Sequence, residues 1–176
     1  MSESESALAA ALVESCRHEI QDLSLDRLRR CLSLLDEEAI WRRPRPELSS
    51  VGNLLSHLAG NVGQWIVSGL GGRPDHRHRA EEFAADTGAP AAELMARLEA
   101  VVAEAVEVMQ GLDAAALTSE FEIQGMRKRG VDAVVHVTEH FSYHVGQIGW
   151  WTKFLTGRDL GYYAGQDLGA TNPPAD

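Results

Sequence analysis

The segment HVTEHFSYHVGQ, residues 136–147, decides how this chain folds and where its chemistry lies. It places three of the seven histidines, His136, His140 and His144, at intervals of four. A helix turns by about 100° per residue, so positions four apart drift by only about 40° and their side chains form one row. An apolar face lies to the side of that row: Val134, Val137, Phe141, Val145, Ile148 and Leu155. We therefore predict a helix over residues 131–156 whose imidazoles border the core.

Three further segments show helical periodicity, with polar breakers between them. The first covers residues 6–36. The second begins at a cap on Ser49 or Ser50 and ends at Gly71, and the third covers residues 90–112. Four helices without a convincing sheet predict an all-α fold, a four-helix bundle. Such bundles build metal and cofactor sites from side chains that project inward from facing helices.

The connecting segments have the composition of loops and turns. Residues 71–89 are polar and predict a surface loop. Residues 118–130, TSEFEIQGMRKRG, alternate apolar and charged side chains, which indicates a short hairpin or an extended excursion between the third and fourth helices. Gly157 is expected to close the fourth helix, leaving a tail over residues 158–176. We expect one domain over residues 1–176.

Composition restricts the classes of partner. Lys and Arg number 16 against 26 Asp and Glu, and the net charge of −10 repels phosphate backbones and anionic lipids. No nucleic acid or membrane partner is therefore expected. No apolar run approaches the roughly 20 residues that span a bilayer. The acidic start MSESESALAA lacks the basic segment of a secretory signal, so a cytoplasmic location is expected.

The two cysteines are not expected to pair. Cys16 and Cys31 lie on the first predicted helix, where their separation corresponds to about 22 Å of axial rise. That is far beyond the reach of a disulfide. We expect both to be small apolar core residues.

A second polar row lies on the second predicted helix, where polar side chains recur at spacings of three and four: Ser50, Asn53, His57, Asn61 and Gln64. If this row faces the histidines of the fourth helix, His57, His140 and His144 can converge, and buried polar groups gain partners. Three histidines with one open position are typical of catalytic zinc. Imidazoles equally suit Ni, Fe or Cu, and the alternative is a buried histidine network without metal.

One competing motif is rejected. HVTEH matches the H-x-x-E-H signature of inverzincin peptidases, in which Glu139 would be the general base. The 36 residues after His140 contain no Glu to act as a distant acidic ligand, so Glu139 is placed at the edge of the site. The other histidines, His18, His76 and His78, are expected at the surface.

Several residues near the two rows are candidates for supporting roles. His136 and Tyr143 are the candidate catalytic acid or base groups, since no other such group lies in the polar row. Asn61 and Gln147 are candidates for orienting the ligands or the substrate through hydrogen bonds, or for bridging helices. The tryptophans Trp65, Trp150 and Trp151 are expected to pack, and one or two of them to line a pocket or a dimer seam.

SVGNLLSHLAGNVGQWI, residues 50–66, together with HVTEHFSYHVGQI, residues 136–148, resembles the DinB-like or YfiT-like superfamily of small helical proteins. The resemblance implies an up-down-down-up four-helix bundle, usually a homodimer. It also implies one divalent metal held by one histidine of the second helix and two of the fourth, which map to His57, His140 and His144. His136, one turn earlier, would support the site without ligating.

The resemblance also implies two kinds of activity on a small molecule. Related proteins are metal-dependent hydrolases, or transferases that add a low-molecular-weight thiol, such as bacillithiol or mycothiol, to an electrophile. The expected cofactor is Zn, Ni, Mn or Fe, with Zn or Ni favoured, and the thiol would be a cosubstrate. The alternatives are a dimeric bundle that binds a metal or small ligand without turnover, linked to stress, and one in which a metal only ties helices together.

Overall fold

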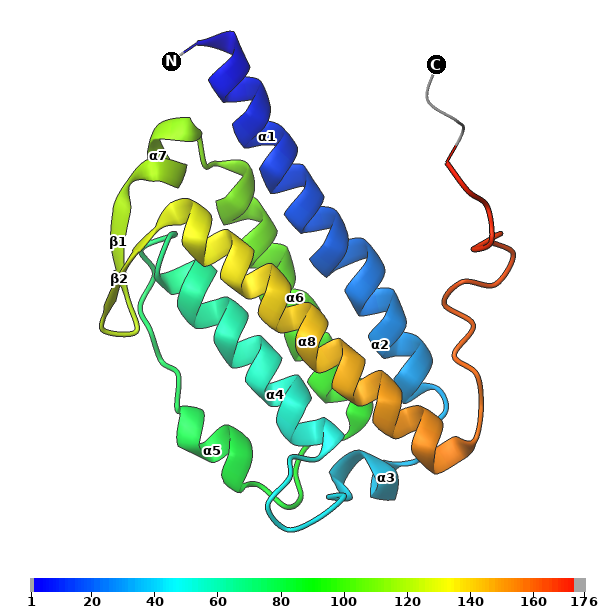
Figure 1. Cartoon of the computed structure of the whole chain (residues 1–176). Helices are drawn as coiled ribbons and strands as arrows, with labels where there is room; N and C mark the ends of the chain where they lie inside the picture. Colours follow the sequence, from blue (N-terminus) through cyan, green and yellow to red (C-terminus); the bar gives the residue numbers. More distant parts are fainter. Residues whose placement is uncertain (1, 173–176) are drawn as a thin grey trace.

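Four long helical stretches lie side by side in the computed structural model, which describes residues 2–172 (Figure 1). The first consists of α1 (Glu3–Arg17), the π-helical segment η1 (His18–Ser24) and α2 (Leu25–Leu32). The second consists of α4 (Val51–Val62) and the π-helical segment η2 (Gly63–Ser68), and the other two are α6 (Ala91–Gln110) and α8 (Gly130–Thr156). In Figure 1, α1 and α8 run in one direction and α4 and α6 in the other, which confirms the up-down-down-up bundle.

Short elements join the long ones. They are α3 (Glu37–Trp41), α5 (Arg79–Ala84), α7 (Ala114–Thr118), β1 (Glu120–Ile123) and β2 (Met126–Arg129). The first long stretch ends at Leu32, earlier than the predicted Asp36, because Asp36 caps the separate helix α3 by accepting a hydrogen bond from the backbone N–H of Ala39. Side-chain caps of this kind supply acceptors to the unpaired N–H groups of a first turn.

Residues 118–130 contain the hairpin that the alternating pattern allowed. β1 pairs antiparallel with β2, and Ile123 faces Met126 across the turn. The two turn residues, Gln124 and Gly125, have φ of 54° and 70°, as a two-residue type I′ turn requires. Ile123 is 2% exposed, so the hairpin closes one end of the bundle core.

The ends of the long helices follow the capping residues. Ser50 accepts a hydrogen bond from the N–H of Asn53 and starts α4 in a capping box. Pro90 precedes α6, and Gly157, with φ of 65°, ends α8. The second helical stretch ends at Ser68, a few residues before the predicted Gly71.

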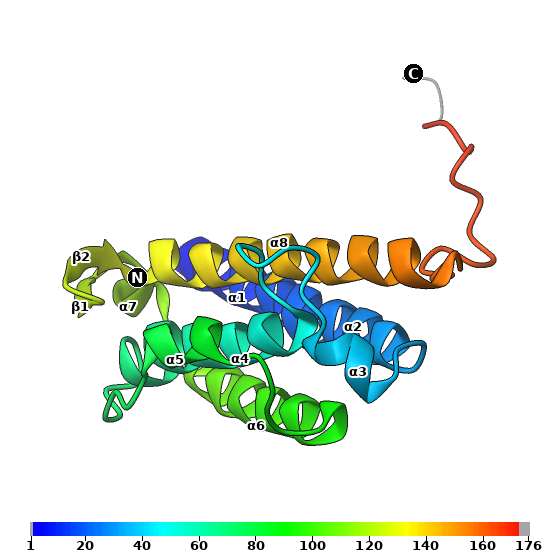
Figure 2. The ribbon, with the colours of Figure 1, turned by 90° about the horizontal axis from the view of Figure 1, so that it is seen from below.

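The core lies between the four stretches. Figure 2 shows α4 between α8 and α6, so α4 contributes buried side chains in two directions. The largest fully buried side chains come from several helices and the hairpin: Leu28, Ile40, Leu55, Leu58, Ile66, Leu98, Met109, Ile123, Phe141 and Ile148. Cys16 and Cys31 are buried free thiols within the described part of the chain, and they pack in this core. No helix among residues 2–172 is both long and apolar enough to span a bilayer.

The predicted tail begins by packing against the bundle. Leu160 is buried, and the Tyr162 hydroxyl lies 3.0 Å from Cys31 Sγ. Arg30 Nη1 donates to the carbonyl of Gly161 at 3.0 Å. The last four residues of the predicted tail, 173–176, which include both of its prolines, lie outside the described residues, as does Met1.

Candidate metal centre

The three histidines expected as ligands come together between α4 and α8. One side-chain nitrogen of each of His57, His140 and His144 lies within 4.8 Å of the others. The closest pair is His57 Nε2 and His140 Nε2, at 2.9 Å. His57 is 3% exposed and His144 is 8% exposed, so the group lies inside the protein, where polar atoms require partners.

Hydrogen bonds at the far side of two rings set which nitrogen carries the proton. His57 Nδ1 lies 2.8 Å from Glu82 Oε2, and His144 Nδ1 lies 2.7 Å from Gln147 Oε1. Both oxygens are acceptors, so each Nδ1 is assigned as the donor and each Nε2 keeps a lone pair. The two rings therefore turn basic nitrogens toward the centre of the group, the arrangement that orients histidine ligands at metal sites.

Burial favours the neutral form of His140 and of His144. Burial, together with smaller contributions in the same direction from His144 and His57, lowers the pKa of His140 to about 3. Burial also lowers the pKa of His144, although its hydrogen bond to Gln147 acts in the opposite sense. Neutral imidazole is the form that ligates a metal, so near neutral pH little free energy is spent on removing protons.

The donor set fits a divalent metal. One shared proton would satisfy the close pair of Nε2 atoms on His57 and His140. That proton would not satisfy His144 Nε2, which is buried and has no hydrogen-bond partner among the residues described. A single cation accepts a lone pair from all three rings. Three imidazoles suit Zn, Ni or Fe, and the donor set does not choose among them.

Two charged residues from the predicted surface loop contribute to the site. Arg77 Nε donates to Glu82 Oε1 at 2.7 Å, and Arg77 Nη2 donates to Glu82 Oε2 at 2.9 Å. Both side chains are nearly buried, at 5% and 10% exposed. Burial of Glu82 opposes its ionisation, but the hydrogen bonds from Arg77 and His57 outweigh that effect and lower the pKa of its carboxyl group. A carboxylate therefore faces His57.

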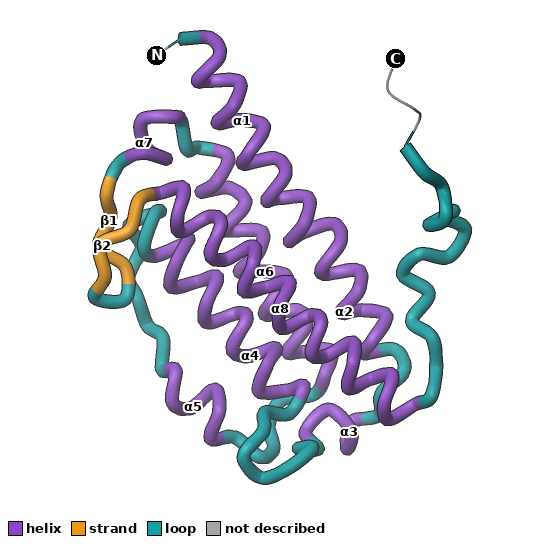
Figure 3. The backbone as a smooth tube through the Cα atoms, in the orientation of Figure 1, coloured by secondary structure: helices purple, strands orange, loops and turns teal. Residues whose placement is uncertain are grey.

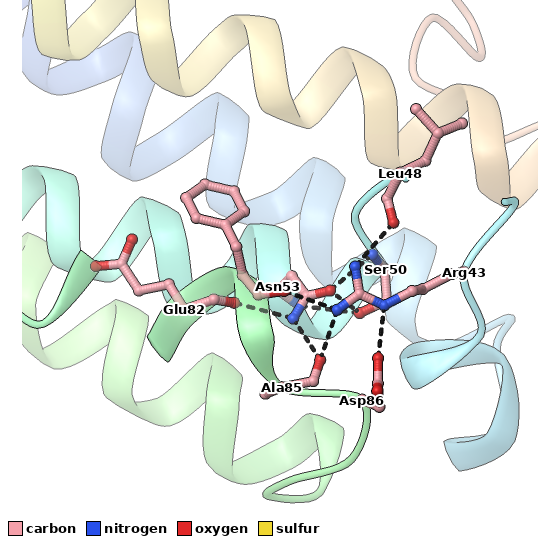
Figure 4. Close-up of polar contacts among 8 residues, drawn as sticks. Arg43, Leu48, Ser50, Asn53, Glu82, Ala85 and Asp86 are labelled. Carbon is pink, nitrogen blue, oxygen red and sulfur yellow. Dashed lines mark hydrogen bonds and ion pairs between the residues drawn. The ribbon is translucent and has the colours of Figure 1, made fainter. Parts of the chain in front are cut away.

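The polar row of α4 holds this segment against the bundle. We call residues 73–86, which include α5, the strap; Figure 3 shows α5 within the long connection between α4 and α6. In Figure 4, the buried Asn53 donates from Nδ2 to the carbonyls of Glu82 and Ala85, at 2.9 and 2.8 Å. Arg43 donates from Nη2 to the carbonyl of Phe83 and from Nε to Asp86 Oδ1, at 2.7 and 2.8 Å. Most residues of the strap are exposed, as expected for a surface loop, but it contains the helix α5, and Arg77 and Glu82 turn inward against α4.

The strap residues carried no periodic pattern that would have revealed them. The only signal was the presence of Arg77 and Glu82 in a segment that also contains exposed charges, such as Arg73 and Glu81. Their burial depends on the fold of the connection, because Arg77 also donates to Gln64 Oε1 of η2 at 2.9 Å. A contact of this kind is set by tertiary structure, so local spacing does not predict it.

The two candidate catalytic residues lie on different sides of the triad. The His136 ring stacks on Trp65, with centroids 3.9 Å apart, and lies 5.4 Å from the His140 ring. Burial lowers the pKa of His136, against the raising effect of Glu139, so His136 is suited to accept a proton. Tyr143 is 61% exposed and its ring lies 5.0 Å from that of His144.

The remaining predicted positions are as follows. Glu139 is exposed and is not part of the metal-ligating group. His18 is about half exposed and pairs with Asp22, and His76 and His78 are exposed on the strap. Asn61 is 4% exposed and lies beside the triad, lining the same cavity as His57 and His140.

An apolar cavity opens beside His144. Its volume is about 550 Å³. The polar side chains of its lining are Glu47, Ser49, His144 and Gln147. Aromatic and aliphatic side chains form most of the rest: Leu54, Phe83, Tyr143, Ile148, Trp150 and Trp151. We call it the aromatic cavity. A mainly apolar pocket with a few convergent polar groups is the usual form of a small-molecule site.

Comparison with known proteins gives the family and the fold. The model of a family described as a protein of unknown function, DUF1572, matches residues 8–163. A DinB-like protein from Bacillus cereus ATCC 10987 has a similar structure, with a TM-score of 0.59 and 17% identity over 76% of this chain and 86% of that one. A conserved protein from Enterococcus faecalis has a TM-score of 0.63 and 16% identity over 87% of this chain and 98% of that one. No curated protein matches.

Proposed function

This chain belongs to the DUF1572 family of DinB-like proteins, and from that premise we propose that it is a divalent-metal-dependent enzyme acting on a small molecule. His57, His140 and His144 would hold the ion. The observation that carries the proposal is the buried Nε2 of His144, which has no hydrogen-bond partner within residues 2–172 and belongs to a group in which one nitrogen of each histidine lies within 4.8 Å of the others.

A divalent ion held there would supply Lewis-acid chemistry, lowering the pKa of a water or thiol that reaches it. The chain's own residues support that chemistry. Glu82 and Gln147 fix the orientation of His57 and His144, so that both rings keep Nε2 available. His136 is neutral near pH 7 and is placed one helical turn before His140, where it would accept a proton from the reacting group.

The aromatic cavity supports a small substrate with an apolar part. Its volume of about 550 Å³ is within the usual range for ligand pockets, and it reaches His144 directly. Tyr143 and Gln147 are the polar groups at this end, so one polar function of the substrate would lie near the triad. The lining favours an electrophile attacked by a thiol, or an ester or amide attacked by water.

The first experiment measures the metal content of the untagged protein by mass spectrometry. We expect about one ion per chain in the wild type, and loss of that ion in His57→Ala and in His140→Ala. His18→Ala, which removes a surface histidine paired with Asp22, should keep the ion. A wild type that takes up no stoichiometric Zn, Ni, Mn or Fe after anaerobic reconstitution would contradict the proposal.

A second experiment separates thiol transfer from hydrolysis and from binding without turnover. The metal-loaded protein would receive a panel of electrophiles with a thiol present or absent. Stoichiometric consumption of thiol identifies transfer, and product formation without thiol identifies hydrolysis. A protein that binds metal at one ion per chain but turns over none of the panel would favour a binding protein instead.

A further inference from the structure

A second cavity borders the triad and shares no lining residue with the aromatic cavity. Its volume is about 440 Å³, and His57 and His140 form part of its wall. Four separate parts of the chain contribute to it: α4 with η2, the strap, the β1–β2 hairpin and α8. The residues that matter here are Asn61, Trp65, Arg79, Met126, Lys128 and His136. We call it the basic cavity.

The charge of this cavity is positive in an acidic protein. Neither Arg79 nor Lys128 forms an ion pair with any residue of the described range 2–172, whereas the third cation, Arg77, is neutralised by Glu82. No Asp or Glu lines the cavity. The chain as a whole carries a net charge of −10, and these two cations without a carboxylate partner, one of which lies over the ring of Phe83, make this a local site for anions.

A buried amide adds a specific hydrogen-bonding group. Asn61 is 4% exposed, and no hydrogen bond joins its side chain to another residue between Ser2 and Asn172. The amide atoms themselves are not fully enclosed, so the small exposed part of Asn61 includes its hydrogen-bonding group. The amide of Asn61 lies at the wall shared with His57 and His140, so a ligand in the cavity would supply that partner close to the triad.

We infer that the basic cavity binds the carboxylate of a small anionic molecule, with Asn61 donating to it and Arg79 and Lys128 supplying the charge. This inference rests on the proposed function, since the bound molecule would be the substrate or cosubstrate that reaches the triad. Trp65 and Met126 provide apolar surface for its carbon part. Both cations are side chains: Arg79 is the first residue of α5, which has only six residues, and Lys128 lies on β2. A phosphate would therefore lack the backbone N–H groups of a long helix N-terminus, and we choose the carboxylate, with inorganic phosphate as an outcome of the test.

The test is isothermal titration of succinate into metal-free protein, so that direct coordination of the carboxylate to an ion cannot contribute. We expect wild-type binding that weakens about tenfold in Asn61→Ala and in Lys128→Met, since hydrogen bonds to charged groups are strong. The neutral diamide of succinate should not bind. If Asn61→Ala does not fold, Lys128→Met still tests the inference, because Lys128 lies outside the core.

A matched control lies on the same strand. Arg127 is 81% exposed, pairs with Glu120 and does not line the cavity, so Arg127→Gln should bind succinate as the wild type does. Equal weakening in Arg127→Gln would overturn the inference in favour of general charge attraction. Tighter binding of inorganic phosphate than of succinate would overturn the choice of a carboxylate, and absence of succinate binding would overturn the site itself.

Metal content, measured separately, distinguishes this inference from the proposed function. A chain that binds one ion but no succinate would overturn only the basic cavity. A chain that binds succinate, with the expected loss in Lys128→Met, but takes up no metal would support the basic cavity and overturn the metal-dependent enzyme.

Discussion

At the scale of the residue, His57 depends on a carboxylate that reaches it from a distant part of the chain. Glu82 accepts hydrogen bonds from His57 Nδ1 and from Arg77. The side chains of Arg77 and Glu82 are both nearly buried. The carboxylate holds one tautomer of His57 and makes its Nε2 more basic. The affinity of the triad for metal is therefore sensitive to a residue that does not itself ligate.

Glu82→Gln tests this dependence. The substitution keeps the size of the side chain and removes the charge, and we expect metal affinity to fall by about 10- to 100-fold. Competition against a chromophoric chelator measures it. Glu81→Gln, at an exposed neighbouring position, is the control. Unchanged affinity in Glu82→Gln would show that the carboxylate does not support the site.

Gly60 gives a second test of the same contact. A Cβ atom at Gly60 would lie 2.8 Å from Arg77 Nε and would also collide with the carboxylate of Glu82. Both are the ends of flexible side chains, so Gly60→Ala should displace the pair without unfolding the protein. We expect weaker metal binding at similar thermal stability, because alanine in a helix offsets some of the strain.

The control for that change is Gly146→Ala on α8, where a Cβ atom would meet nothing within 4 Å. It should raise stability by up to about 1 kcal/mol, as expected for replacing glycine in a helix, and leave metal affinity unchanged. Equal affinities in Gly60→Ala and Gly146→Ala would contradict the role given to the Arg77–Glu82 pair.

At the scale of the element, the strap is attached by buried polar side chains more than by apolar contacts. Asn53 and Arg43 bond to its backbone carbonyls, and α5 contributes no fully buried residue. An element held in this way opens more easily than the core helices, because few apolar contacts must be broken. Because Glu82 of the strap bonds to His57 Nδ1, opening of the strap would remove the contact that orients the His57 ring.

Arg43→Ala is expected to release the strap. It removes donors to Phe83, Ala85 and Asp86, so hydrogen exchange should become faster across the strap while α6 and α8 keep their protection. Metal affinity should fall in the same direction as in Glu82→Gln. Arg45→Ala, an exposed change close by, serves as the control. Unaltered exchange in Arg43→Ala would mean that other contacts hold the strap.

At the scale of the whole molecule, the buried histidines make the metal-free bundle sensitive to acid. The pKa of His140 is lowered from its ordinary 6.5 to about 3 in the folded protein. Between these values the unfolded chain binds more protons than the folded chain, so the free energy of unfolding rises with pH and is lost as pH falls. We expect the melting temperature of metal-free protein to fall from pH 7 to pH 5.

His140→Gln isolates the contribution of that imidazole. The variant should show a smaller drop in melting temperature between pH 7 and pH 5 than the wild type, because one group that takes up a proton on unfolding is gone. Calorimetry on chelator-treated samples at the two pH values measures the difference. Equal drops in both proteins would contradict the assignment.

Assembly is the other property of the whole molecule, and we propose that the homodimer expected from the family resemblance forms through an exposed aromatic surface of α8. Trp150 and Phe154 on α8 stack with ring centroids 5.6 Å apart and are 64% and 66% exposed. Exposed apolar patches of this kind often mark interfaces. Light scattering should give a dimer mass for the wild type and a monomer mass for Phe154→Glu. Leu8→Glu, at a position 73% exposed on α1, should stay dimeric. A monomeric wild type would contradict the proposal.

The sequence by itself determined the bundle and the three histidines. Helical periodicity is a local property, and a row at spacings of four on 131–156 faces one direction whatever surrounds it. His57 belongs to a second such row on α4, so the convergence of His57 with His140 and His144 required only that two polar rows meet. The alternating residues of 118–130 likewise indicated a short hairpin, and Gly157 indicated the end of the fourth helix, because both signals are local.

Only the tertiary structure decided what surrounds the triad. Glu82, Arg77 and the two cavities depend on how the strap folds back over α4, and the strap has no repeating pattern from which that path could be read. The sequence left Trp150 between packing and lining a pocket or a dimer seam, and in the structure it is 64% exposed and lines the aromatic cavity. Periodicity reports the face of one element, whereas a buried ion pair and a cavity exist only where several elements meet.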